Sequence, residues 1–219
     1  VGLNEQVCVS DFGAVCYANK DADYNEIILK SLLNNPDGIP VVWLARLWGL
    51  KIVCQTMGPE LFECMLKNSK SDIKHFLLGD TDEVLEAILK KYNVLNNGSI
   101  VGTYSPPFIP VQNYDYSFIS NIINESNANI VWVSMTSPKQ DFFGKKILPL
   151  LDKKIVIGVG AAFRIAIGKT KIPDGFIRKI GLAGFMRKAN FWSDTKWYIK
   201  HFCLLMIYSF EILYQLVFC

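Results

Sequence analysis

Short runs of apolar, mostly β-branched residues recur along the middle of the chain. Residues 130–135 (IVWVSM) and 155–159 (IVIGV) are too short for helices and too continuous for strands with one face in water. Such runs are typical of strands that are buried on both faces of a parallel sheet. They predict an α/β fold with a Rossmann-like parallel sheet flanked by helices.

Amphipathic stretches alternate with these runs. The run at 73–78 (IKHFLL) precedes residues 81–92, in which apolar side chains recur at helical spacing, and a further run at 99–101 precedes a second such stretch at 116–124. Strand, polar loop and helix in repetition indicate a parallel sheet covered on both faces.

The first forty residues fit the same scheme. We expect a strand near residues 6–10 and helical material from 12 to 33 that runs into 34–38 (NNPDG), of which 35–38 has the composition of a turn. Ligands of parallel sheets bind at the carboxyl ends of the strands. The candidate binding loops are therefore residues 79–80, 102–108, 136–140 and 158–163.

The charge of the chain is unevenly distributed. The net charge of +3 over 219 residues is too small for a nucleic-acid binder, yet residues 164–200 hold nine Lys or Arg and two Asp. This basic segment favours an anionic partner such as phospholipid headgroups or a diphosphate, with a solvated basic face as the alternative. Six cysteines without a Cys-x-x-Cys pair, and two histidines, argue against a zinc site and indicate a reducing compartment. No signal peptide is visible, and the start at Val1 suggests that an N-terminal piece is missing.

The C-terminal end is strongly apolar. As a helix, residues 203–219 would measure roughly 25 Å, less than the ~30 Å hydrocarbon core of a bilayer, and Glu211 would lie near its middle. We predict a helix that lies in the membrane interface; a helix buried against the domain or in an oligomer contact is the alternative. The predicted domains are an α/β core at 1–180 and a basic, then apolar, helical appendage at 181–219.

Four loops carry candidate chemistry. In residues 102–108 (GTYSPPF), two prolines and two aromatic residues form a wall for a flat base, or they only fix a crossover. The carboxylate in residues 35–38 (NPDG) can serve as a general base, although alone the tetrapeptide is a turn. Residues 138–141 (PKQD) offer an ammonium and an amide to a diphosphate or a sugar, or they cap the next helix. The two glycines in 158–163 (GVGAAF) permit close approach of a phosphate or a sugar. The third glycine and the later acidic residue of a nicotinamide enzyme are missing, which disfavours a nucleotide-sugar oxidoreductase.

The order of these motifs resembles that of the TagA/WecG/CpsF glycosyltransferases over roughly residues 7–200. The matching blocks are NPDG at 35–38, FLLG at 76–79, VGTYSPPF at 101–108, PKQD at 138–141, GVGAAF at 158–163, and then Gly168, Pro173, Gly181-Leu182 and Arg187.

The resemblance implies an inverting, metal-independent enzyme without a cofactor. It would transfer an N-acetylmannosamine-type sugar from a UDP-sugar to a polyprenyl-diphosphate-linked acceptor, in the synthesis of a cell-surface polysaccharide. Such a protein is expected to be peripheral, at the cytoplasmic face of the bacterial membrane. Association with further copies of the chain stays open.

The resemblance also implies residue roles. Asp37 matches the catalytic base of the family, and Gln140 matches a substrate contact. Arg187 matches the first arginine of the family's C-terminal appendage, which docks on the membrane. The full set of expected substrate-binding residues is Asp11, Asn35, Gly79, Thr103, Tyr104, Pro107, Lys139, Gln140, Gly158, Gly160, Arg187 and Lys196.

The chain departs from the family pattern at several positions. Val9-Ser10-Asp11 replaces a Thr-x-Asn pattern, Gln55 replaces an arginine, and Arg164 replaces an acidic residue. Residues 181–184 (GLAG) replace Gly-Leu-Glu-Trp. These departures motivate an alternative hypothesis, a divergent, non-catalytic, membrane-associated member of the same fold.

Overall fold

The computed structural model describes residues 4–51, 53–92 and 98–171. The chain divides into two units. The first consists of Val1–Asp37 with Gln55–Lys171, and the second of Gly38–Cys54 with Ile172–Cys219. The domain boundary expected at 180/181 and the membrane helix expected after residue 202 lie outside the described residues, so both stay predictions.

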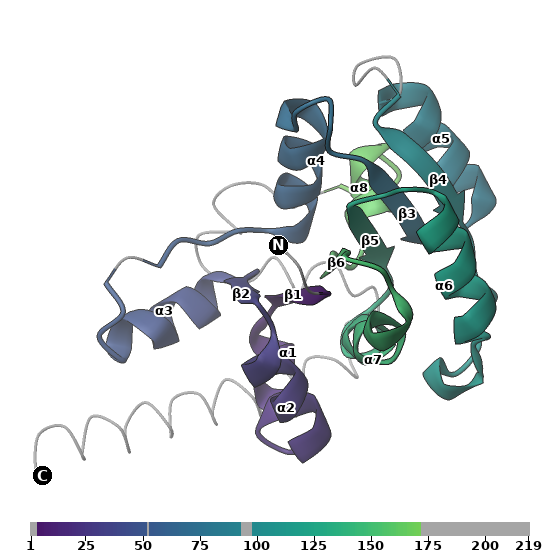
Figure 1. The fold of residues 1–219 in the computed structure, drawn as a ribbon. Coiled ribbons are helices and arrows are strands. Elements are labelled where there is room, and N and C mark those ends of the chain that lie inside the picture. The colour runs from purple at the N-terminus through teal and green to yellow at the C-terminus, as the bar shows by residue number, and fades with distance from the viewer. Residues whose placement is uncertain (1–3, 52, 93–97, 172–219) are drawn as a thin grey trace, which may run out of the picture. The chain divides into compact units, whose positions relative to one another are not determined.

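The first unit contains a six-stranded sheet in which every neighbouring pair is parallel (Figure 1). The spatial order is β2-β1-β6-β5-β3-β4. The predicted α/β class with a parallel sheet is thereby confirmed. Since all strands run in one direction, their six carboxyl ends share one edge. The strands are β1 (Glu5–Ser10), β2 (Leu33–Pro36), β3 (His75–Gly79), β4 (Ile100–Tyr104), β5 (Ile130–Ser134) and β6 (Ile155–Gly158).

Helices cover both faces of the sheet (Figure 1). One face is covered by α4 (Gly58–Asn68), α5 (Asp82–Tyr92) and α8 (Ala162–Ala166). The other is covered by α1 (Phe12–Ala18), α2 (Ala22–Lys30), α6 (Tyr116–Glu125) and α7 (Lys139–Ile147). Short 3-10 helices lie at Val111–Asn113 and Leu148–Leu150.

Aspartates begin three of these helices. The carboxylates of Asp11, Asp21 and Asp115 accept hydrogen bonds from backbone N–H groups in the first turns of α1, α2 and α6. Each bond satisfies a donor that has no partner within its helix. These caps explain why the chain turns from strand or loop into helix at these points.

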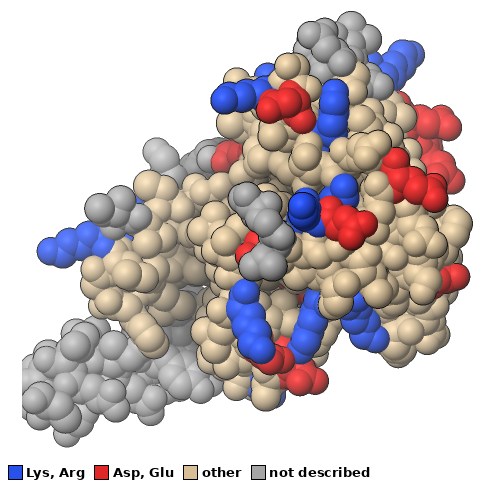
Figure 2. Space-filling view, in the orientation of Figure 1, with Lys and Arg blue, Asp and Glu red and all other residues tan. Residues whose placement is uncertain are grey.

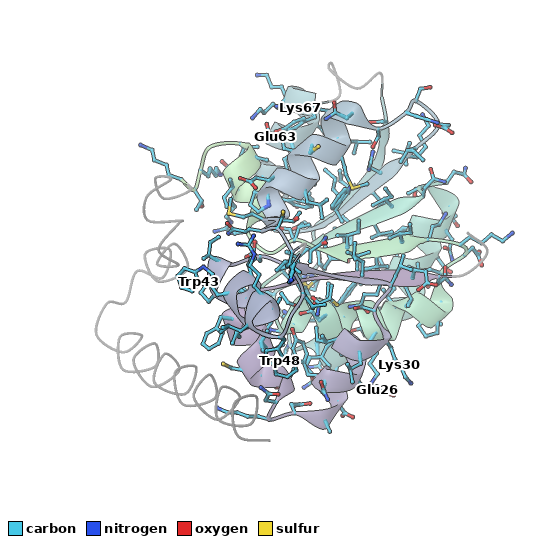
Figure 3. All side chains as sticks on the ribbon, turned by 90° about the vertical axis from the view of Figure 1, so that its left-hand side faces the viewer. Glu26, Lys30, Trp43, Trp48, Glu63 and Lys67 are labelled. Carbon is cyan, nitrogen blue, oxygen red and sulfur yellow. The ribbon has the colours of Figure 1, made fainter. Side chains whose placement is uncertain are left out.

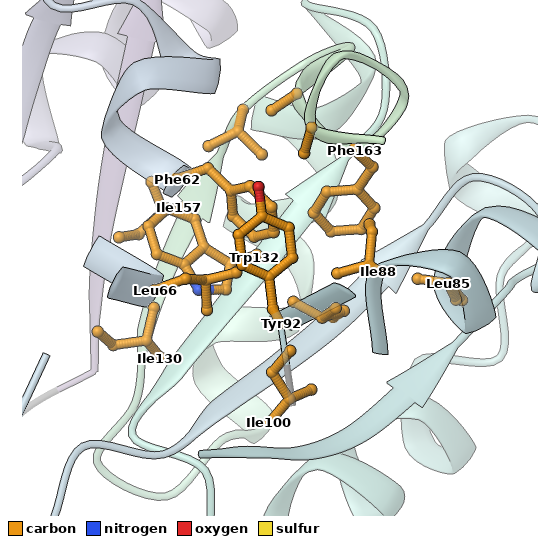
Figure 4. Packing of buried hydrophobic residues seen from close by; sticks show 14 of the residues in the cluster. Phe62, Leu66, Leu85, Ile88, Tyr92, Ile100, Ile130, Trp132, Ile157 and Phe163 are labelled. Atoms are coloured by element: carbon orange, nitrogen blue, oxygen red, sulfur yellow. The ribbon is translucent and has the colours of Figure 1, made fainter. Parts of the chain in front are cut away.

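The core is built from rows of side chains that the parallel register aligns. Leu77 pairs with Trp132, Trp132 with Ile157, and Ile157 with Val7, so these four residues share one face across four strands. Trp132 is fully buried, and the ring of Phe62 meets it edge-on with the centroids 5.2 Å apart (Figure 4). This row joins α4, α5 and α8 to the sheet.

The segment between residues 12 and 38 differs from the expectation. Instead of helical material as far as residue 33, α1 and α2 are separate helices, and β2 follows them. The turn expected at 35–38 is also wrong, because Asn35 and Pro36 belong to β2 and pair with Val9 and Ser10. Proline lacks a backbone N–H, and an edge strand tolerates it. Periodicity does not reveal so short and polar a strand.

In the second unit, α3 (Ile39–Leu47) begins directly after Gly38 with proline in its first turn. Proline suits this position because its N–H would have no partner within the helix. Among the residues that the structure describes, no helix has the length and apolar character needed to cross a bilayer.

We predict that His75 makes stability depend on pH. Its Nδ1 accepts a hydrogen bond from Trp132 Nε1 at 3.0 Å. Burial, together with the Lys74 charge, lowers its pKa from 6.5 to about 4. The imidazole therefore binds a proton more readily in the unfolded chain than in the folded one. Its contribution to the free energy of unfolding is present above pH 6.5 and is lost as pH falls towards 4. Over this window it amounts to about 3 kcal/mol.

Urea unfolding of the parent protein and His75→Gln across this pH range measures the contribution. The buried Asp141, whose pKa is raised to about 6, acts in the opposite direction because its contribution is lost as pH rises through 6. Both proteins retain Asp141, so the difference between them isolates His75. Equal pH dependence of the two proteins would contradict the prediction.

Candidate active site

Asp37 lies immediately after β2 at the carboxyl edge of the sheet. Its N–H donates to the Ser10 carbonyl at 3.0 Å, which extends the pairing of β2 with β1. The Gln55 side chain donates to the Asp37 carbonyl at 2.8 Å. The carboxylate accepts a hydrogen bond from the Gly58 N–H at 3.1 Å. Asp37 is therefore held through its backbone and its side chain.

Gly58 is the first residue of α4, so the Asp37 carboxylate meets the N-terminus of an 11-residue helix. Unpaired N–H groups and the helix dipole stabilise negative charge at this position. Gly58 also packs closely against β6, since a Cβ built on it would lie 2.8 Å from the Val159 carbonyl oxygen. The backbone at Gly58 thus joins the carboxylate to the loop after β6.

Gln140 holds the next part of that loop. Its Oε1 accepts a hydrogen bond from the Gly160 N–H at 2.8 Å, and a Cβ on Gly158 would lie 2.9 Å from its amide. Ser134 at the end of β5 donates to the Gly160 carbonyl at 2.7 Å. Gly160 has φ +57°, which favours glycine. A side-chain amide and a hydroxyl therefore fix the backbone of the glycine loop.

These contacts bring three predicted segments together: Asp37, the 158–160 loop and Gln140. β2 and β6 are separated only by β1, so their ends lie about 10 Å apart at ordinary strand spacing. The group combines a fixed carboxylate with a loop whose glycines carry no side chain, so that a substrate can approach its backbone closely. The arrangement is suited to accepting a proton from a bound hydroxyl.

Asp11 and Asn35 lie near this group, at the end of β1 and within β2. Asp11 is exposed, and its Oδ1 accepts a hydrogen bond from the Ala14 N–H at 2.9 Å as the cap of α1. Asn35 pairs with Val9 of β1 and is partly exposed. Both positions are compatible with a substrate contact, and that role stays a prediction.

The loop expected at 102–108 lies at the other end of the sheet, and its expected start is wrong, because residues 102–104 belong to β4. β2 and β4 are the two edge strands, five strand spacings or about 24 Å apart. A bound molecule would have to extend along the whole edge to touch both Asp37 and the end of β4. Thr103 and Tyr104 are the last residues of β4, and Pro107 lies in the loop that follows it.

The side chain of Lys139, at the start of α7, contacts the loop that follows β4. Its Nζ donates to the Ile109 carbonyl at 2.6 Å and lies 4.6 Å from the ring centroid of Phe108 and 5.1 Å from that of Tyr114. The ammonium therefore binds the loop after β4. The expected diphosphate contact stays a prediction, and binding a diphosphate would require this ammonium to exchange its present partners.

Between the two ends lies an ion pair. Asp80 has φ +59°, and its nearly buried carboxylate binds Arg164 Nε at 2.9 Å, while the Arg164 side chain is half exposed. Ser105 donates to the Asp80 carbonyl at 2.7 Å. The preceding Gly79 is needed for close packing, because a Cβ there would overlap the Ser134 carbonyl oxygen. Gly79 thus aligns the ends of β3 and β5.

The carboxylate, the glycine loop and the amide agree with a sugar-transferring protein. A model of the glycosyl transferase WecG/TagA/CpsF family matches residues 2–211 of the chain. The chain belongs to this family. The resemblance that the order of the motifs indicates is thereby confirmed.

Two Bacillus proteins are similar to this family member. One from Bacillus subtilis, named N-acetylglucosaminyldiphosphoundecaprenol N-acetyl-beta-D-mannosaminyltransferase, is 26% identical over 171 residues, which are 78% of this chain and 65% of that protein. A protein of the same name from Bacillus spizizenii is 25% identical over 163 residues, 74% of this chain and 62% of that protein. The chain spans just under two thirds of the length of these relatives.

Two departures from the family pattern make contacts at this edge. Gln55, in place of an arginine, holds the Asp37 carbonyl, and Arg164, in place of an acidic residue, pairs with Asp80. Arg187 and Lys196 lie outside the described residues, and their roles stay predictions. Within residues 4–171, apart from 52 and 93–97, no group of three His, Cys, Asp or Glu side chains is placed to hold a metal ion.

Sequence reasoning missed Gly58, and it gave no supporting role to Asp80 and Asp141, although both lie in segments that it singled out. Asp141 is buried and accepts hydrogen bonds from Tyr24 at 2.8 Å and Ser137 at 3.0 Å. These bonds fix the turn before Gln140. The sequence Gly58-Pro59 indicates the start of a helix, and this was the one signal that pointed to Gly58. Only the fold shows that its backbone packs against Val159.

We predict that Gly58→Ala destabilises the fold. The added methyl group would overlap the Val159 carbonyl, so the free energy of unfolding should fall by about 1–3 kcal/mol. Gly38→Ala is the matched control, because its Cβ would meet nothing closer than Pro40 Cδ at 3.5 Å. Urea unfolding of the two variants makes the comparison. Equal stability of Gly58→Ala and the parent protein would show that this close approach is not required.

Proposed function

We propose that this chain is an inverting glycosyltransferase that moves a sugar from a UDP-sugar to a polyprenyl-diphosphate-linked acceptor, with Asp37 as the base. The observation that carries the proposal is the Asp37 carboxylate, held by the Gly58 N–H beside the glycine loop after β6. The names of the Bacillus relatives support the type of donor sugar and the lipid-linked acceptor.

In the proposed reaction, Asp37 takes the proton of an acceptor hydroxyl as that oxygen attacks the anomeric carbon. The bond from this carbon to the UDP oxygen breaks on the opposite side, so the configuration inverts. One carboxylate suffices for a single displacement of this kind. The hydrogen bond from Gly58 favours the ionised carboxylate, which is the form that accepts a proton.

Negative charge develops on the departing diphosphate and requires stabilisation. The backbone of the 158–160 loop can approach a phosphate closely because Gly158 and Gly160 carry no side chain. Arg164 follows this loop and exposes about half of its side chain, so we propose it as a source of positive charge. The proposal includes no metal ion.

The acceptor lipid sets the proposed location. A polyprenyl chain is confined to the bilayer, so the protein must meet its substrate at the membrane surface. We propose a peripheral protein at the cytoplasmic face of the bacterial membrane. The basic stretch from residue 164 to 200 supports this location, since phospholipid surfaces are anionic.

We predict that Asp37→Asn lowers kcat for transfer by about 10²–10⁴-fold, the usual contribution of a general base. The amide oxygen of asparagine can still accept the Gly58 hydrogen bond, so the fold should remain intact. Radiolabelled UDP-N-acetylmannosamine with a short-chain lipid-diphosphate acceptor measures the rate. Asp115→Asn is the matched control, because Asp115 also accepts a hydrogen bond at a helix N-terminus but lies before α6.

Full activity of Asp37→Asn would remove this residue from the mechanism. Calorimetric titration with UDP separates the enzyme from the non-catalytic alternative. The parent protein and Asp37→Asn should both bind UDP, because the base acts on the acceptor. A parent protein that neither binds UDP nor transfers sugar would favour the non-catalytic hypothesis.

A further inference from the structure

The second unit exposes a group of large apolar side chains. Trp43, Leu47, Trp48 and Leu50, which we call the α3 patch, are 44%, 50%, 69% and 59% exposed. Trp43 and Leu47 are four residues apart in α3 and share one face of the helix. Figure 3 shows Trp43 and Trp48 on the α3 segment. Such a group on one short segment indicates an interaction surface.

The backbone holds the α3 patch in a defined turn. The Gly49 N–H donates to the Arg46 carbonyl at 3.1 Å, and the Leu50 N–H donates to the Ala45 carbonyl at 3.0 Å. Gly49 has φ +85°, so these bonds form the motif with which helices commonly end on glycine. Arg46 also donates to the Val53 carbonyl at 3.0 Å. Trp48 and Leu50 are thus presented by an ordered helix end.

The charged residues within the stretch of chain that carries the α3 patch have one sign. Residues 38–59 contain Arg46 and Lys51 and no Asp or Glu. In Figure 2, the surface over α3 is mostly tan and shows blue but no red side chains. Tryptophan and leucine beside basic residues are the composition of segments that insert into the headgroup region of an anionic bilayer.

The α3 patch is also close in sequence to the proposed base. Gly38 joins Asp37 directly to the first residue of α3. At 3.8 Å between consecutive Cα atoms, this short link keeps the carboxylate near the start of the helix. The start of α3 therefore follows the proposed base directly in the chain.

We propose that the α3 patch docks on the surface of an anionic phospholipid bilayer and thereby tethers the chain, whose proposed base Asp37 is two residues before α3, to the membrane. The nine residues of α3 measure about 14 Å as a helix, so α3 lies in the interface and does not span it. Trp43, Leu47, Trp48 and Leu50 enter the boundary of the acyl chains, and Lys51 faces the phosphates. The catalytic consequence, access to a diphosphate at the end of a lipid, rests on the proposed function; the docking itself does not.

Vesicle binding of the full chain tests the docking. Trp48→Ser/Leu50→Ser should weaken partitioning into phosphatidylcholine–phosphatidylglycerol vesicles about tenfold, because two exposed apolar side chains are lost. Leu29→Ser/Leu32→Ser is the matched control, since these leucines are 75% and 55% exposed in the first unit. Its partitioning should stay within twofold of the parent protein. Lys51→Glu should weaken binding to these vesicles and have little effect with phosphatidylcholine alone.

Quenching by brominated phospholipids reports on insertion directly. Part of the tryptophan fluorescence of the parent protein should be quenched, and Trp43→Phe/Trp48→Phe should lose that part. The proposal is overturned if Trp43→Phe/Trp48→Phe is quenched as much as the parent protein. It is also overturned if Trp48→Ser/Leu50→Ser and Leu29→Ser/Leu32→Ser partition equally. A serine variant that loses self-association but partitions like the parent protein would assign the α3 patch to a second copy of the chain, which also overturns it.

The activity assay separates this proposal from the proposed function. Trp48→Ser/Leu50→Ser should retain transfer to a short-chain, water-soluble acceptor and lose about tenfold with a polyprenyl acceptor in vesicles. If the parent protein transfers to neither acceptor, the proposed function fails while partitioning and quenching still decide the docking. Equal loss with both acceptors would contradict a role of the α3 patch at the membrane.

Discussion

The close approach of Gly58 to Val159 is the contact on which the candidate site depends. A backbone N–H at the start of α4 donates to Asp37, while the same residue packs on the carbonyl that follows β6. A side chain at residue 58 would separate the helix from the sheet and move the donor away from the carboxylate. One glycine therefore couples helix packing to the position of the proposed base.

The parallel sheet then determines which candidates can act together. Its order places β2, β1 and β6 side by side and puts β4 at the opposite edge. Asp37, the 158–160 loop and Gln140 form one connected group, whereas Thr103 and Tyr104 lie about 24 Å away at ordinary strand spacing. The Asp80–Arg164 pair lies between these regions and joins the helix after β6 to the loop after β3.

Much of the fold could be predicted because its strands are buried on both faces. The runs that contain Trp132 and Ile157 carry a continuous apolar signal, and these strands are found where that signal lies. β2 escaped prediction because it is a four-residue edge strand of sequence LNNP, half of it exposed. Without a buried face, a strand has no periodic apolar signal, and Asn-Pro-Asp-Gly then has the composition of a turn.

The sequence alone determined the α/β class, the family and the identity of Asp37 as the proposed base. These properties are carried by local runs and by the order of short motifs, which are features of the chain itself. Only the tertiary structure decided that Gly58 holds this carboxylate, that Gln140 holds Gly160, and that Lys139 binds the loop after β4. These partners are 20 to 30 residues apart, and the strand order and helix packing that bring them together have no local signal in the sequence.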